Sequence, residues 1–328
     1  KAFYDDHAAR DAAVISIAAE NPDIFSDIDP KRLTDASMAA GKALMDYRAR
    51  LMSNKNTWCV VSVPTTAWAC KVFPDCSSEE AVEKLWSAIL SAARISGTDD
   101  PVSAWHAHIE RLQKITAFLN AHDFAELRYQ NNLGTDLCIE LPKGHIWMGG
   151  AERSASGTLF AANIPTEEVY TMPKRNGVNG TVFASKPLHY NGNLIEDFSL
   201  TFRDGKVVDY RVQQGGEHLK ELLETDEGAS YLGEVALVPH DSPISQSGIL
   251  FYNTLFDENA SCHLALGKAY PTCIENGENM TEDELRQHSV NHSLVHEDFM
   301  IGTADLTVIG RTSFGETVTI MEHGNFAF

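Results

Sequence analysis

The sequence lacks the features that mark a membrane-spanning, exported or nucleic-acid-binding protein. No apolar run approaches the ~18 residues that are needed to cross a bilayer, and no basic segment followed by an apolar stretch indicates export. Basic residues are few, because 26 Lys and Arg stand against 46 Asp and Glu, for a net charge of −20. Nucleic acids and anionic membranes are bound through Lys and Arg, so we expect neither partner.

Cysteine is scarce as well. The six cysteines form no Cys-x-x-Cys pair, and six in 328 residues make no disulfide framework. We therefore expect buried free thiols in a reducing cytosol. Cys262 stands beside His263, a pairing that suggests a cysteine nucleophile. Neighbours on a helix point about 100° apart, however, which disfavours a hydrogen bond between these two side chains.

The length of 328 residues, with 43% hydrophobic and 22% charged residues, allows two domains. Residues 1–145 are predicted to form a helix-rich α/β domain, with helices at 35–51, 78–95 and 105–122 and a buried strand at 58–64. Residues 146–328 are predicted to form a β-rich catalytic domain that binds metal, and the fold class is therefore α+β. Because the chain begins at Lys1 rather than Met, we expect an N-terminal segment to be missing.

After Phe124 the sequence pattern changes from one typical of helices to one typical of strands. Asp204-Gly205 between two apolar runs predicts a two-residue hairpin. Helices are expected at 217–224 and at 254–270. Strands are expected at 125–129, 135–141, 159–163, 181–185, 194–203, 206–211, 231–238, 306–309 and 317–321.

Three short apolar windows in the second half carry carboxylates and imidazoles. In the first, Glu234 follows Gly233 and leads into the apolar run 235–238. A buried carboxylate without a nearby cation is costly, so Glu234 requires either a salt-bridge partner or a metal ion. Glu, His and Asp together are ligands for zinc, manganese and cobalt. The pattern predicts a metal-dependent hydrolase.

The second window is expected to be a helix. Tyr270 lies seven residues after His263, two turns along the same helix face. Glu258 lies five residues before His263, about 140° around a helix, so both reach one site only if Glu258 lies in a frayed end or loop. A purely structural helix with Asp257 as its cap is the alternative.

The third window begins at His296. If it is a strand, His296 and Asp298 share one face and Glu297 points away, which makes a two-ligand clip. A fourth segment places Glu167 and Glu168 after Pro165, where they either line a site or begin a helical turn.

Taken in order, four stretches of the sequence resemble peptidase family M29, the thermophilic aminopeptidases of the T, S and II group. The stretches are 163–169, 233–238, 251–270 and 296–302. The stretch around His263 is the most specific. The resemblance is close from about residue 145 to 328, and the helical N-terminal part shares only the general character.

The resemblance implies a cytoplasmic metalloaminopeptidase, usually a homodimer, that acts on peptides with a free N-terminus. It implies two divalent metal ions (Co2+, Zn2+, Mn2+ or Mg2+) as cofactors. Each position of the family's site holds the expected residue type, so an active enzyme is expected. The implied ligands are Glu168, Glu234, His263, His296 and Asp298, with Glu258 as a further ligand or acid and Tyr270 as a catalytic side chain.

This ligand set predicts a mechanism in which two cations about 3.5–4 Å apart share a carboxylate and activate a water. Glu234 is the expected shared carboxylate because it is held in a rigid strand. Tyr270 is expected to donate a hydrogen bond to the oxyanion. Glu258 is expected to carry protons, with Glu168 as the alternative.

Two other functions remain open. One is a different two-metal hydrolase, a phosphoesterase or amidohydrolase, although the region lacks the basic cluster that a phosphate would favour. The other is a non-catalytic, metal-stabilised binding protein, which would keep the ligands and show no turnover.

Overall fold

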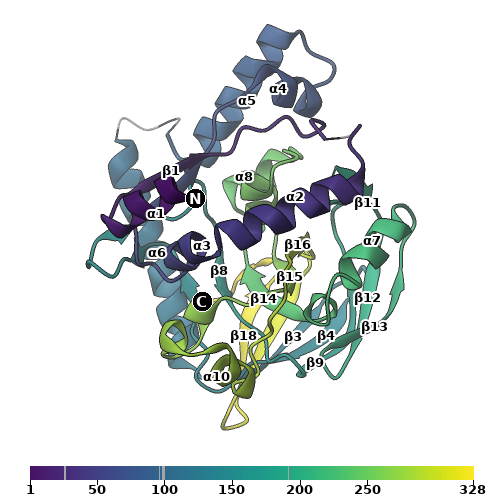
Figure 1. Cartoon of the computed structure of the whole chain (residues 1–328). Coiled ribbons are helices and arrows are strands. Elements are labelled where there is room, and N and C mark those ends of the chain that lie inside the picture. Colours follow the sequence, from purple (N-terminus) through teal and green to yellow (C-terminus); the bar gives the residue numbers. More distant parts are fainter. Residues whose placement is uncertain (26, 96, 98–99, 191) are drawn as a thin grey trace. The chain divides into compact units, whose positions relative to one another are not determined.

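The structure of the chain is a computed structural model that describes residues 1–25, 27–95, 97, 100–190 and 192–328 (Figure 1). The chain divides into two compact units. The first consists of residues 1–109, 150–166 and 249–256, and the second of residues 110–149, 167–248 and 257–328. The expected division into domains 1–145 and 146–328 stays a prediction.

The first unit is mainly helical and contains one parallel pair of strands, β1 (Val14–Ile17) and β2 (Trp58–Val61). The buried strand expected at 58–64 is confirmed as a strand over residues 58–61, which are half-buried rather than buried. Thr65 and Ser77 cap the helices that follow, since each hydroxyl accepts a backbone N–H from the first turn. The helices are α1 (Ala2–Ala9), α2 (Pro30–Ala43), α3 (Met45–Met52), α4 (Thr66–Val72) and α5 (Ser78–Ala92), and the short strands β6 (Glu152–Arg153) and β7 (Leu159–Phe160) form a further pair. Helix α6 (Pro101–Ala121) runs from the first unit into the second.

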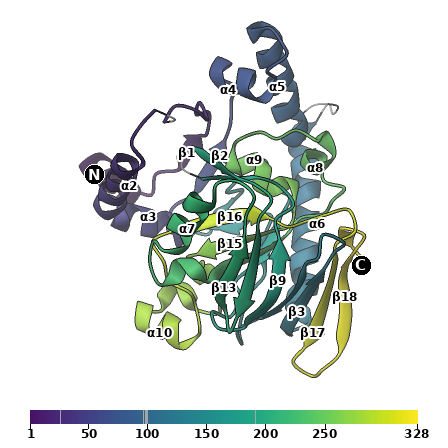
Figure 2. The same ribbon diagram turned by 90° about the vertical axis from the view of Figure 1, so that its right-hand side faces the viewer.

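The second unit contains a large antiparallel sheet, whose strands run side by side in Figure 2. Among the described residues it has eight strands, in the order β13-β12-β9-β4-β3-β17-β18-β19. Most expected strands are confirmed here, with ends that shift by a few residues, but the strand expected at 194–203 begins in this sheet only at Ser199. The bounds are β3 (Phe124–Gln130), β4 (Asp136–Glu140), β9 (Val178–Phe183), β12 (Ser199–Arg203), β13 (Lys206–Arg211), β17 (Thr307–Thr312), β18 (Thr317–Glu322) and β19 (Asn325–Phe326).

The hairpin expected at Asp204-Gly205 joins β12 to β13. Both turn residues have positive φ, 48° at Asp204 and 84° at Gly205, as a tight two-residue connection requires. A Cβ on Gly205 would lie 1.8 Å from the carbonyl oxygen of Arg175. Only glycine fits this position.

A second antiparallel sheet of the same unit carries the candidate functional residues. In the described part of the chain it has five strands, in the order β16-β15-β14-β8-β5. Its central strands β14 and β15 are buried at every residue. One hydrophobic core includes side chains from both sheets, such as Leu137, Val235 and Leu264. The bounds are β5 (Met148–Gly149), β8 (Val169–Thr171), β14 (Leu232–Leu237), β15 (His263–Gly267) and β16 (His296–Met300).

The prediction of a helix at 254–270 is wrong. The chain instead forms a short helix α9 (Thr254–Asp257), a 3-10 turn at Glu258–Ala260, and then strand β15. A strand that is buried on both faces has a continuous apolar sequence, and its pattern does not differ from that of a buried helix. His263 and Tyr270 therefore do not share a helix face.

The remaining elements of the second unit are short. They are α7 (Gly216–Leu223), α8 (Pro243–Ser247), α10 (Glu282–Gln287) and the hairpin strands β10 (Leu188–Tyr190) and β11 (Asn193–Ile195). Helices combined with largely antiparallel sheets confirm the α+β class. In the part of the chain that the structure describes, no helix has the length and apolarity needed to cross a membrane.

Candidate metal centre

One row of paired residues crosses the middle of the five-stranded sheet. Glu234 of β14 pairs with Ala265 of β15, and Ala265 pairs with Asp298 of β16. Directly paired residues in antiparallel strands point to the same face. The two carboxylates therefore lie on one face, with only a methyl group between them. This leaves room above Ala265.

The two histidines stand on the same face. His263 is two residues before Ala265 on β15, and His296 pairs with Gly267, two residues after it. Side chains two residues apart on a strand share a face. The expected placement of His296 and Asp298 on one face of a strand is thus confirmed in the strand register, with Glu297 paired to Leu266 on the other side.

A bulge next to Gly233 sets the register of Glu234. The pairing of β14 with β15 shifts between Leu232 and Glu234. A Cβ on Gly233 would lie 2.4 Å from the carbonyl oxygens of both Gly267 and Lys268. Glycine lets these backbones approach closely.

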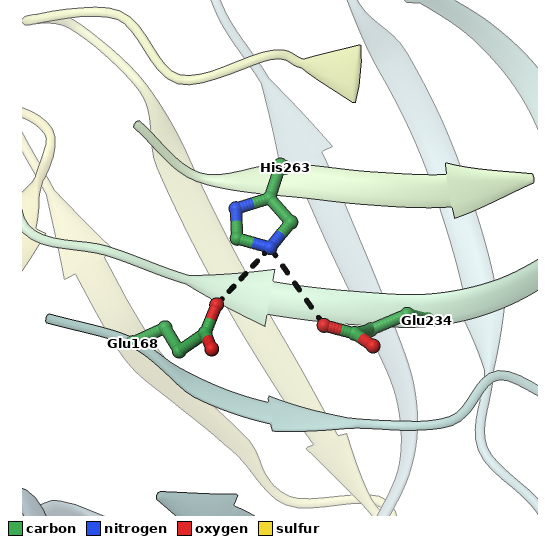
Figure 3. A group of neighbouring side chains, drawn as sticks. All are labelled: Glu168, Glu234 and His263. Carbon is green, nitrogen blue, oxygen red and sulfur yellow. Dashed lines mark ion pairs between the residues drawn. The ribbon is translucent and has the colours of Figure 1, made fainter. Parts of the chain in front are cut away.

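Glu168 reaches this face from the loop just before β8. Its Oε2 lies 3.2 Å from Nε2 of His263, and Oε1 of Glu234 lies 3.7 Å from the same nitrogen. Figure 3 shows the two carboxylates converging on this one ring nitrogen. Ligand atoms of these three buried residues lie within 4.8 Å of one another, close enough to hold a metal ion.

His296 and Asp298 complete the cluster. Nε2 of His296 lies 3.4 Å from Oε2 of Glu234 and 3.7 Å from Oδ1 of Asp298. That Asp298 oxygen also lies 4.0 Å from Nε2 of His263. All five residues that the motifs predict as ligands therefore meet on one sheet face.

The donor set fits divalent cations. Glu234 Oε2 and Asp298 Oδ1 are buried without a hydrogen-bond partner. Within the described residues, the ion pairs of Glu168, Glu234 and Asp298 are all with imidazoles. Three carboxylates buried together repel one another, and cations bound by oxygen and nitrogen ligands offset that cost.

Backbone carbonyls orient both imidazoles. Nδ1 of His263 donates to the carbonyl oxygen of Ser261 over 3.1 Å, and Nδ1 of His296 donates to that of Lys268 over 2.7 Å. A proton held on Nδ1 leaves Nε2 available to bind a metal ion, the usual arrangement of a metal-binding histidine. The sequence carries no signal for these carbonyl partners, because every residue has one.

The electrostatics of the cluster follow from crowding. Burial, together with the nearby Glu168 and Asp298, raises the pKa of Glu234, although His263 and His296 oppose this. Burial lowers the pKa of His263, but the neighbouring carboxylates outweigh it and raise that pKa well above the usual value. Without cations, the protonated forms of Glu234 and His263 are thus favoured.

Glu258 and Tyr270 lie beside the five ligand candidates. Glu258 is in the 3-10 turn before β15; burial first, then the charges of Glu168 and Asp298, raise its pKa well above normal. Burial also raises the pKa of Tyr270, whose ring packs edge-on against His296 with centroids 4.8 Å apart. These shifts favour the protonated form of both side chains, so each can donate a proton or hydrogen bond.

Cys262 is no nucleophile. Its Sγ donates to the carbonyl oxygen of Val238 over 3.2 Å and lies 3.6 Å from the sulfur of Met321. Burial raises its pKa to about 11, and a protonated thiol does not attack a carbonyl. All six cysteines are free, as expected, but only Cys262 and Cys273 are buried and the other four are half-buried.

The fold and the cluster define a metal-dependent peptidase. The sequence profile of the thermophilic metalloprotease family (M29) matches residues 1–326, and the chain belongs to this family. The family and the enzyme class that the motifs predict, a metalloaminopeptidase, are thus confirmed.

Sequence similarity to known aminopeptidases extends along nearly the whole chain. The chain is 55% identical to Aminopeptidase 2 of Geobacillus stearothermophilus, over 98% of this chain and 77% of the relative. It is 50% identical to Aminopeptidase AmpS of Bacillus subtilis, over 98% and 78%. The solved structure of wild-type AmpT from Thermus thermophilus superposes with a TM-score of 0.91 at 38% identity, over 99% of this chain and 80% of that one. Similarity therefore extends through the N-terminal part, further than the motifs alone indicate.

Proposed function

We propose that this chain removes single residues from the N-terminus of peptides, using water activated by two divalent metal ions. The ligands are Glu168, Glu234, His263, His296 and Asp298. The observation that carries the proposal is the convergence of three buried carboxylates and two oriented imidazoles on one sheet face. Relatives at 50–55% identity bear the name aminopeptidase.

Glu234 is the carboxylate best suited to serve both metal ions. Its Oε1 faces His263 and its Oε2 faces His296, so its two oxygens point toward different imidazoles. Divalent ions bound here would lower the pKa of a water and polarise the scissile carbonyl. The rigid central strand holds Glu234 in place for this task.

Glu258 and Tyr270 are the side chains suited to donate a proton or a hydrogen bond during the reaction. Burial and the charge of Glu168 raise the pKa of Glu258 and so favour its protonated form, which suits Glu258 to pass a proton to the leaving amine. The Tyr270 hydroxyl keeps its hydrogen and can donate a hydrogen bond to the oxygen that gains charge during attack.

The test is hydrolysis of aminoacyl amides with a free amine, compared with the same compounds after N-acetylation. Protein stripped with a chelator is assayed alone and after addition of Co2+, Zn2+, Mn2+ or Mg2+. Cleavage that requires metal and is confined to free-amine substrates supports the proposal. Equal cleavage of blocked substrates or of phosphoesters would support a different two-metal hydrolase. Metal binding without turnover would support a binding protein.

A homodimer and a cytoplasmic location are further proposals that rest on the family resemblance. Light scattering during size-exclusion chromatography measures the mass of the particle against the 36.1 kDa of one chain. Cell fractionation tests the location.

A further inference from the structure

Asn259 is a buried amide next to the candidate metal centre. It lies in the 3-10 turn before β15, directly after Glu258, and is fully buried. Its Oδ1 accepts the backbone N–H of Glu167 over 2.7 Å. Glu167 immediately precedes the candidate ligand Glu168, so this bond holds the backbone of the loop one residue before the ligand.

The backbone of Glu168 needs support on both sides to aim its carboxylate. On its C-terminal side, β8 begins with Val169, which pairs with Leu237 of β14. On its N-terminal side, the bond from Glu167 to Asn259 is one support within the second unit. If that acceptor is lost, the backbone before β8 is held less tightly, and the Glu168 carboxylate gains freedom to move.

The main chain of Asn259 is anchored as well. The buried Ser242 hydroxyl donates to the carbonyl oxygen of Asn259 over 3.5 Å and accepts the N–H of Ser245 over 3.1 Å. Ser242 follows β14, the strand that carries Glu234. Asn259 is thus bonded to the segment before Glu168, adjoins Glu258 in sequence, and is bonded to the segment after β14.

We propose that Asn259 is a positioning residue that fixes the spacing between Glu168 and the turn bearing Glu258. It acts through the backbone of Glu167 and does not itself ligate metal. The proposal rests on the proposed function, because it takes Glu168 as a metal ligand. Partners that orient metal ligands affect metal affinity or activity by roughly 10–100-fold, and Asn259 belongs in this class.

The experiment compares metal affinity among folded variants, measured by competition with a chromophoric chelator. Asn259→Ala removes the acceptor, and we expect its dissociation constant for Co2+ to rise roughly tenfold or more. Asn259→Asp keeps an oxygen of the same reach that can accept the N–H of Glu167, and we expect its Co2+ affinity to exceed that of Asn259→Ala. The metal-induced rise in Tm should rank the variants in the same order as their Co2+ affinities. In Asn259→Ala, kcat should fall by a larger factor than KM changes.

Asn56→Ala is the matched control. Asn56 is also fully buried, and its side chain bonds to the carbonyl oxygen of Ala8 and to Arg50, but it belongs to the first unit. The Asn56→Ala substitution should lower the Tm of the metal-free protein and leave Co2+ affinity unchanged. If Asn259→Ala does not fold, Asn259→Ser replaces it, because its hydroxyl is too short to reach Glu167.

The outcomes distinguish failure of the positioning role of Asn259 from failure of the proposed function. Wild-type metal affinity in both Asn259→Ala and Asn259→Ser, or an equal loss in Asn56→Ala, overturns the positioning role while leaving the proposed function intact. Failure of Asn259→Asp to restore affinity lost in Asn259→Ala also overturns it. Wild-type protein that binds no metal overturns both the positioning role and the proposed function.

Discussion

Glu234 and Asp298 flank Ala265 in one row across three neighbouring strands, on the same face of the sheet. A methyl group at the centre of the row leaves the space above it to the carboxylates and imidazoles around it. The small side chain of Ala265 is therefore as much a part of the site as the ligands are.

Replacing Ala265 by Leu should abolish metal binding. The larger side chain occupies the space between Glu234 and Asp298, and overpacking a core position costs about 1–3 kcal/mol, which a folded protein can tolerate. Metal content after dialysis and the Tm of the metal-free protein are the measurements. Ala92→Leu, in the buried face of α5, should lower the Tm similarly and keep its metal. Full metal content in Ala265→Leu would contradict this account.

Glu234→Ala should abolish activity and metal content together. The substitution removes the carboxylate whose two oxygens face His263 and His296. Elemental analysis and hydrolysis of a free-amine substrate measure the two losses. A fully active variant would show that the two-metal scheme is wrong.

Glu258→Gln should separate proton transfer from metal binding. If Glu258 is an acid rather than a ligand, kcat falls by about 10²–10⁴-fold, while metal content stays at the wild-type level. Loss of metal in this variant would instead make Glu258 a ligand. Kinetics and elemental analysis on the same preparation decide between these roles.

Tyr270→Phe removes the hydroxyl and keeps the ring that packs against His296. We expect kcat to fall about 10²-fold or more, as for removal of one oxyanion donor, with little change in KM or metal content. Unchanged kcat would exclude the Tyr270 hydroxyl from the reaction.

The metal-free protein should lose stability as the pH rises from about 5 to 8. Burial, together with Asp298, raises the pKa of Glu297 from 4.5 to about 8. Over that interval the folded state keeps a proton that the unfolded state has released, so the free energy of unfolding falls by up to about 1.4 kcal/mol per pH unit. The raised pKa values of Glu234 and Glu258 act in the same direction.

Urea unfolding in the presence of a chelator measures this slope. Glu297→Gln has no proton to lose, so its stability should depend less on pH than that of wild type. Parallel curves for the two proteins would contradict the assignment of the slope to Glu297.

Some of the site follows from local pattern alone. A strand alternates its faces every residue, so the order His296-Glu297-Asp298 is enough to place the first and third side chains together. The hairpin at Asp204-Gly205 is equally local, because a turn type depends on two adjacent residues. The four stretches that resemble the M29 family indicate the chemistry without any knowledge of distance.

Other features depend on the partners of each strand. His263 was expected on a helix because strand β15 is buried on both faces and its sequence does not alternate. The pairing of Ala265 with both Glu234 and Asp298 depends on register across three strands, and a bulge at Gly233 sets part of that register. The bond from Glu167 to Asn259 joins residues 92 positions apart.

The sequence by itself therefore determined which chemical groups are available and which protein family the chain resembles. Both follow from residue types and their local spacing along the chain. Only the tertiary structure decided that five ligand candidates meet on one face, that Ala265 leaves space between them, and that carbonyl oxygens orient both imidazoles. The physical reason is that metal binding depends on distances of a few ångströms between segments far apart in sequence. Strand register and packing set those distances, and neither is encoded at any single position.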